Sequence, residues 1–85
     1  MSVVSKTIKY LLDKNISVST AESCTGGLLA AEFTAVSGIS KIYKTGLITY
    51  SNDSKIKNLK VKSSTIKRYG AVSRQVCAQM CLHLH

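Results

Sequence analysis

Apolar positions near the start of the chain recur with the period of a helix. Val4, Ile8 and Leu11 follow one another at intervals of three and four residues, so they share one face of a helix. We therefore expect an amphipathic helix over residues 3–14. Asn15 comes next, and asparagine tolerates the left-handed backbone that often ends a helix. The pattern predicts a helix with one buried face.

Two short segments further along the chain have apolar patterns that predict strands. Residues 16–20 alternate apolar side chains with serines, and residues 46–50 form a second β-prone run. Between them, residues 28–36 read as a mostly apolar helix that Gly38 closes, and residues 40–45 as a connector or short helix. Strands separated by helices predict a parallel α/β arrangement.

The last third of the chain predicts three short helices. We expect one beginning near Ser54 after a polar cap, one from Ser63 or Ser64 to Gly70, and one capped by Ser73. The final helix reaches the end of the sequence without a stop signal, and two strands are few for a parallel sheet. These two features predict that the chain is a truncated α/β domain.

The charge is concentrated in one part of the chain. The 85 residues carry a net charge of +8, and residues 41–68 hold eight Lys or Arg against a single acid, Asp53. Such a stretch attracts nucleic acid, an anionic membrane surface or a phosphorylated small molecule. It is rich in lysine and poor in interleaved aromatics, which favours a solvated face. A basic nucleic-acid-binding module therefore stays a second alternative. No apolar run is long enough to span a membrane, and we expect a soluble, cytoplasmic protein.

Three cysteines give an odd count with no disulfide spacing, so we expect reduced thiols. Cys77 and Cys81 lie four residues apart, and His83 and His85 follow. These four side chains are of types that can bind a metal ion. No second ligand pair occurs elsewhere, so we interpret these residues, and Cys24, as small core residues. We expect neither a metal nor another cofactor.

A turn of small residues at positions 21–27 is the first candidate site. Gly26 and Gly27 let the backbone approach a ligand, and the hydroxyls of Ser23 and Thr25 belong to the same turn. The N–H groups at the start of the following helix favour an anion or a developing oxyanion. By itself a Gly-Gly turn that enters a helix is more often explained by packing, and it is not a P-loop because no Gly-Lys-Ser/Thr follows.

The segment from Tyr50 to Lys55 is the second candidate site. It follows the second strand, and ligands of parallel α/β sheets collect at the carboxyl ends of strands. A lysine there can hold a phosphate or act as a base for a serine. Without further context, Lys55 is one of ten lysines, and the interpretation as a solvated lysine is favoured.

Three blocks of the sequence resemble the CinA C-terminal domain, the family that includes the nicotinamide-nucleotide amidases. Residues 20–27 (TAESCTGG) resemble its signature, and residues 46–52 (GLITYSN) with Lys55 resemble its second block. Residues 59–61 and 70–73 resemble the third. The blocks occur in the family's order across nearly all of residues 1–85. The resemblance implies a three-layer α/β/α fold, of which this chain is a truncated copy.

The resemblance also implies an amidohydrolase that needs no metal or cofactor. Its substrate would be nicotinamide mononucleotide, and its products nicotinic acid mononucleotide and ammonia, in bacterial pyridine-nucleotide salvage. Ser40 would be the nucleophile, and Tyr50 and Lys55 would activate it. The substrate would be held by the first candidate turn, through Ser23, Thr25, Gly26 and Gly27.

The chain departs from the family in two places. Residues 36–40 (VSGIS) replace the usual Pro-Gly-Ser-Ser, and the family's later Gly-rich block is absent. We therefore expect little turnover by the chain alone. The alternative to an active amidase is an inactive remnant, or a half-domain that works after self-association or with a complementary C-terminal half.

Overall fold

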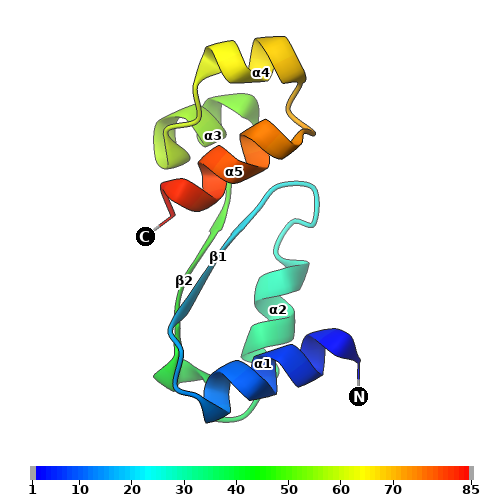
Figure 1. Ribbon diagram of the computed structural model, residues 1–85, viewed down its shortest axis with the longest axis vertical. Coiled ribbons are helices and arrows are strands. Elements are labelled where there is room, and N and C mark those ends of the chain that lie inside the picture. The colour runs from blue at the N-terminus through cyan, green and yellow to red at the C-terminus, as the bar shows by residue number, and fades with distance from the viewer. Residues whose placement is uncertain (1, 85) are drawn as a thin grey trace.

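The computed structural model describes residues 2–84 and consists of six helical elements and two strands (Figure 1). In chain order they are α1 (Val3–Asp13), β1 (Val18–Glu22), α2 (Leu28–Thr34), the 3-10 helix η1 (Ile39–Lys41), β2 (Tyr43–Ile48), α3 (Asn52–Leu59), α4 (Ser63–Tyr69) and α5 (Arg74–Leu82). The predicted mixed α/β class is confirmed.

The two strands pair in parallel, as the alternation of strands and helices predicts. Thr20 pairs with Gly46, and Glu22 pairs with Ile48 at the carboxyl ends. The register shifts between Val18 and Ser19, so Lys44 is left as an extra residue on β2. The carboxyl ends of both strands therefore lie at the same end of the sheet.

Helices cover both faces of this small sheet. On one face, the ring of Tyr43 stacks on Phe33 of α2 at 5.2 Å between centroids, and its hydroxyl lies 2.7 Å from that of Thr20. On the other face, Ala21 and Leu47 pack against the apolar side of α5. Because successive strand residues point to opposite faces, this contact pattern gives the three layers that the family resemblance implies.

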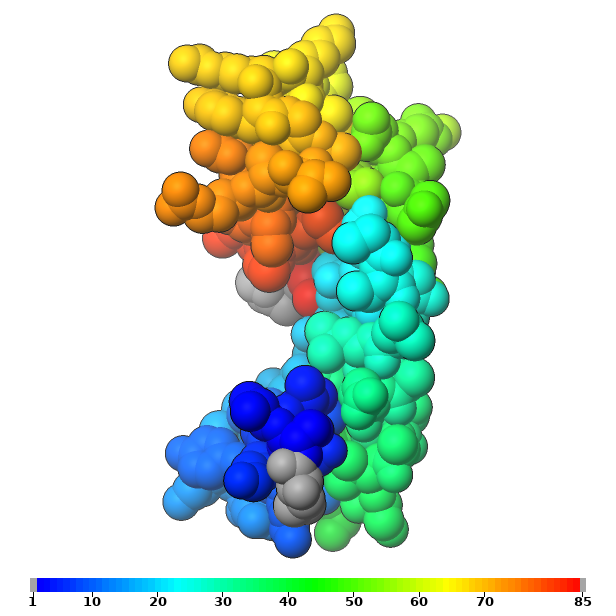
Figure 2. All heavy atoms as spheres, turned by 90° about the vertical axis from the view of Figure 1, so that its right-hand side faces the viewer, coloured from blue at the N-terminus to red at the C-terminus, as the bar shows by residue number. Residues whose placement is uncertain are grey.

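The core is divided into two clusters. Ile8, Phe33, Ile39 and Ile42 form the buried cluster of the N-terminal lobe, which comprises α1, α2 and η1. Leu59, Val61, Val76 and Met80 form that of the C-terminal lobe, which comprises α3, α4 and α5. The molecule measures 40 × 22 × 17 Å, and its surface is hollowed between α1 and α5 (Figure 2). The two strands run from one lobe to the other.

Most predicted helix ends are confirmed. Asn15 has the left-handed φ of 56°, the Ser51 hydroxyl accepts from Ser54 N–H, and the Ser73 hydroxyl accepts from Val76 N–H. Gly70, with a φ of 83°, ends α4. Helix α3 begins at Asn52, two residues before the predicted start, because Ser51 is its cap.

Both strands differ from their predicted ranges. β1 begins two residues later than expected and extends to Glu22, because this glutamate pairs with Ile48 and is buried. β2 begins at Tyr43, three residues earlier than expected. The ring of Tyr43 stacks on Phe33 of α2, and this contact stabilises the extended backbone there. The sequence pattern places Glu22 in a turn and residues 43–45 in a connector.

The prediction that the cysteines are buried is wrong. Cys24, Cys77 and Cys81 are all exposed. On α5 the residues Val76 and Met80 face the sheet, so Cys77 and Cys81 fall on the outer side of the helix. His85 lies outside the described residues. Within residues 2–84, no three His, Cys, Asp or Glu side chains gather closely enough to hold a metal ion.

None of the helices described between residues 2 and 84 is long and apolar enough to cross a bilayer.

Candidate functional site

A hollow of about 440 Å³ opens at the carboxyl end of β1. Its wall combines the end of β1, the following turn, the start of α2, one lysine of α3 and the start of α5. The lining residues are Ala21, Glu22, Ser23, Cys24, Thr25, Leu29, Lys55, Ala71, Val72, Ser73, Cys77 and Met80. Both candidate sites of the sequence therefore contribute to one hollow.

Lys55 is the buried cation of this hollow, with 3% of the residue exposed. The Ser51 cap starts α3 directly after the strand region, which puts Lys55 in the first turns of the helix. Its Nζ donates a hydrogen bond of 3.0 Å to the carbonyl oxygen of Tyr50. The interpretation of Lys55 as one more solvated lysine is therefore wrong.

Glu22 is the second buried charged residue here, with 4% exposed. Its Oε1 accepts hydrogen bonds from the Thr25 hydroxyl and from Leu29 N–H, both at 2.8 Å. Its Oε2 accepts from Ala30 N–H at 3.0 Å. The carboxylate thus joins the end of β1 to the turn and to the start of α2. Sequence reasoning gave Glu22 no role.

The start of α2 is consequently not open to a ligand as predicted. The N–H groups of Leu29 and Ala30 are held by Glu22, and that of Leu28 donates to the Thr25 carbonyl oxygen. Gly27 begins the helix with a φ of 107°, a conformation that suits glycine. The expected anion or oxyanion position is already filled by a carboxylate of the same chain.

The hydrogen bonds set the acidity of Glu22. Burial raises its pKa, but the hydrogen bonds from Leu29, Thr25 and Ala30, with a smaller contribution from the nearby Gly27 N–H, together outweigh burial. The pKa of Glu22 therefore lies below its ordinary value of 4.5. The ionised form is the one that the folded protein stabilises.

This lowered pKa predicts a pH-dependent contribution to stability. It is fully present above pH 4.5 and is lost as the pH falls through the lower pKa of the folded state. We expect Glu22→Gln to lower the free energy of unfolding by about 2 kcal/mol at pH 7. The difference from wild type should shrink towards pH 3 in urea titrations. A difference that stays constant between pH 7 and pH 3 would contradict the ionised carboxylate.

The hydroxyl groups around the hollow differ in whether they form hydrogen bonds within the chain. Thr25 donates to Glu22, and Ser73 donates to the Gly70 carbonyl oxygen at 2.9 Å while capping α5. Ser23 is half-buried, and within residues 2–84 no hydrogen bond to its hydroxyl is found. Ser23 is thus the lining hydroxyl that is free to contact a bound molecule.

Ser40 lies far from this hollow. It is exposed in η1, before the start of β2, whereas Lys55 follows the end of that strand. The six residues of β2 between them span roughly 20 Å at about 3.3 Å per residue. Tyr50 is 70% exposed and is tied to Lys55 through its backbone. The structure brings Ser23, Thr25 and Lys55 to one hollow, but leaves Ser40 at the other end of the sheet.

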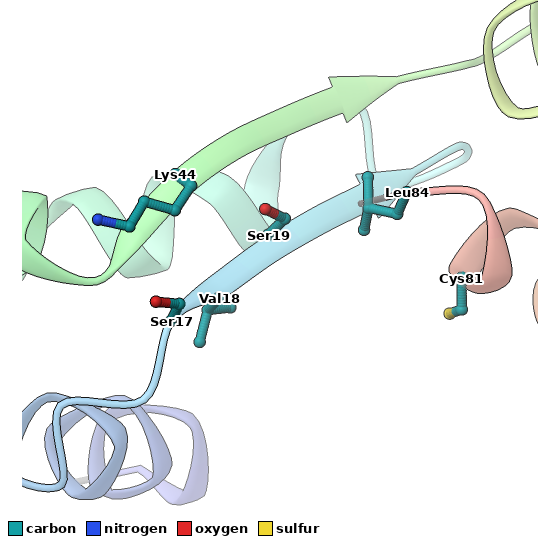
Figure 3. Close-up of a pocket in the computed structure, with 6 residues that line it drawn as sticks. All are labelled: Ser17, Val18, Ser19, Lys44, Cys81 and Leu84. Atoms are coloured by element: carbon teal, nitrogen blue, oxygen red, sulfur yellow. The ribbon is translucent and has the colours of Figure 1, made fainter.

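A second hollow of about 570 Å³ lies beside β1 and the end of α5 (Figure 3). It is lined by Ser17, Val18, Ser19, Lys44, Cys81 and Leu84. The Lys44 side chain is directed away from Cys81 and Leu84, and its Nζ donates to the Lys41 carbonyl oxygen at 3.1 Å. Among the six described residues that line this second hollow, none is both buried and charged, so we place the candidate site beside Lys55.

The fold and the blocks around the Lys55 hollow agree with one known family. Residues 1–84 match the CinA C-terminal domain. The chain belongs to this family.

Two curated relatives share the name competence-damage inducible protein. A competence-damage inducible protein of Clostridium novyi is 56% identical over 72 residues, which are 85% of this chain and 17% of the relative. A protein of the same name from Acetivibrio thermocellus is 51% identical over 72 residues, again 85% and 17%. The chain thus spans about one sixth of the length of these relatives.

Solved structures show the same fold over a longer chain. The competence/damage inducible protein CihA of Agrobacterium tumefaciens superposes with a TM-score of 0.88 at 37% identity, covering 99% of this chain and 56% of that chain. A competence damage-inducible protein A from Klebsiella pneumoniae gives a TM-score of 0.89 at 32% identity, covering 95% and 50%. The chain therefore corresponds to about half of these structures.

Proposed function

We propose that this chain carries the lysine part of a nicotinamide-nucleotide amidase site. The reaction is hydrolysis of the carboxamide of nicotinamide mononucleotide to nicotinic acid mononucleotide and ammonia. The observation that supports it most directly is that the buried residue Lys55 lines a hollow together with Ser23, whose hydroxyl has no hydrogen bond within residues 2–84. Membership of the CinA C-terminal domain family supports the same activity through the resemblance of its blocks.

The chemistry needs few groups. A serine hydroxyl adds to the carboxamide carbon while its proton passes to a base. The base then gives this proton to the amide nitrogen, and ammonia leaves as the C–N bond breaks. Water then hydrolyses the acyl-serine and releases the acid. A lysine can serve as base for the serine without a histidine. A volume of about 440 Å³ is within the range of small-molecule sites.

The amidase proposal is tested by ammonia release from nicotinamide mononucleotide. We expect little turnover by the 85-residue chain alone, and an increase when the remaining half of the domain is supplied from a relative such as the Agrobacterium protein. Folded protein that releases no ammonia in either form would support the inactive-remnant alternative.

The position of Ser40 gives the nucleophile its own test. Ser40 and Lys55 lie at opposite ends of β2. Ser40 can therefore act as the nucleophile beside Lys55 only if it comes from a second copy of the chain. The variants Ser40→Ala and Lys55→Ala would then be inactive alone. Mixed in equal amounts, they should recover about a quarter of wild-type activity, since half of random dimers are mixed and hold one intact site of two.

The control for this mixture is Ser23→Ala, which alters the free hydroxyl inside the hollow. Loss of activity in Ser23→Ala, together with no recovery in the mixture, would assign the nucleophile to Ser23 of the same chain.

A further inference from the structure

Glu22 joins the turn of residues 23–27 to the start of α2, and neither the family resemblance nor the proposed chemistry gives it a role. We infer that Glu22 is a positioning residue that fills the anion position at the start of α2, fixes the turn that carries Ser23, and excludes the substrate's phosphate from that helix. The statement about the phosphate rests on the proposed function. The statements about the turn do not.

Three donors converge on the two oxygens of this carboxylate. One comes from the turn, through Thr25, and two come from the first turn of α2, through Leu29 and Ala30. Glu22 itself is anchored in the sheet, where it pairs with Ile48, and its carbonyl oxygen accepts from Thr49 N–H. The turn of residues 23–27 is thus held at both ends by one buried side chain.

The same geometry restricts where a negatively charged group can bind. A helix start normally attracts an anion through its free N–H groups. Here those of Leu29 and Ala30 already donate to a carboxylate, and a phosphate beside them would meet its negative charge. Lys55 is the only lysine or arginine among the residues that line the hollow. The substrate's phosphate is therefore bound away from α2, and the carboxamide is the end that enters beside Ser23.

Removal of the carboxylate tests the positioning role. In Glu22→Ala the N–H groups of Leu29 and Ala30 lose their acceptor, and we expect the melting temperature to fall by about 10 °C. Added sodium formate should occupy the vacated place and raise the melting temperature of this variant by several degrees, while sodium chloride at equal ionic strength should not. The matched control is Glu32→Ala, which removes the other glutamate of the sequence, an exposed residue of α2. It should show neither effect.

Phosphate binding tests the exclusion, with a readout that a purely structural glutamate would not give. Inorganic phosphate titrated into the wild-type chain should leave the amide resonances of Leu29 and Ala30 unshifted. In Glu22→Ala, or in the uncharged Glu22→Gln if the alanine variant does not fold, the same titration should shift them. Shifts of these two amides in the wild-type chain would overturn the inference, as would a Glu22→Ala protein that formate does not stabilise.

These outcomes are separate from the amidase assay. Failure to release ammonia would remove the proposed function and the statement about the substrate's phosphate, while the formate and inorganic phosphate results would still decide the role of Glu22.

Discussion

Replacement of Lys55 by methionine is expected to lower ammonia release from nicotinamide mononucleotide about 1,000-fold, measured in the assembly that gives turnover. Loss of a general base typically costs two to four orders of magnitude. Methionine keeps an unbranched apolar stem of similar length, so the buried position of Lys55 stays filled. Lys55→Arg should be equally inactive, because a guanidinium does not give up its proton in proteins.

Lys57 provides the matched control, two residues further along the same helix. It is exposed and pairs with Asp53 at 3.1 Å on the surface. Lys57→Met should therefore retain wild-type turnover, since exposed ion pairs contribute little. Equal activity in the Lys55 and Lys57 variants would place the chemistry outside the hollow.

The largest effect on stability is expected from Leu59→Ala. Leu59 is fully buried among Val61, Val76 and Met80, and Met80 also lines the hollow. Truncation of a buried leucine removes apolar burial and leaves a cavity, at a cost of about 3 kcal/mol. Small domains have total stabilities at the lower end of 5–15 kcal/mol, so this loss is a large fraction of the whole.

Urea unfolding followed by circular dichroism measures this loss. Ile56→Ala is the comparison, because Ile56 lies on the same helix with 37% of the residue exposed. It should cost less than about 1 kcal/mol. Similar losses in both variants would mean that the C-terminal cluster is not the packed core described above.

Sequence patterns predicted the parts of the fold that depend on local chemistry. The period of Val4 and Ile8 gave the first helix, and Ser51 and Ser73 are caps in the structure. The position of Lys55 after the second strand predicted its place at the carboxyl end of the sheet. These features depend on neighbours within a few residues, which a sequence displays directly.

The remaining features depend on contacts that spacing along the chain does not reveal. The carboxylate of Glu22 reaches Leu29 and Ala30 only because β1 and α2 pack together, so the helix start that was predicted to be free is filled. Tyr43 joins the sheet through its contact with Phe33. Ser40 and Lys55 are separated because an extended strand lies between them.

The two buried clusters have a consequence for how the chain unfolds. Ile8 and Phe33 belong to one cluster, Val76 and Met80 to the other, and the strands are the main link between them. A cooperative transition requires one continuous core, whereas separate cores open with separate free energies. We therefore expect the amide hydrogens of the N-terminal helix to exchange through local opening while the C-terminal helices remain folded.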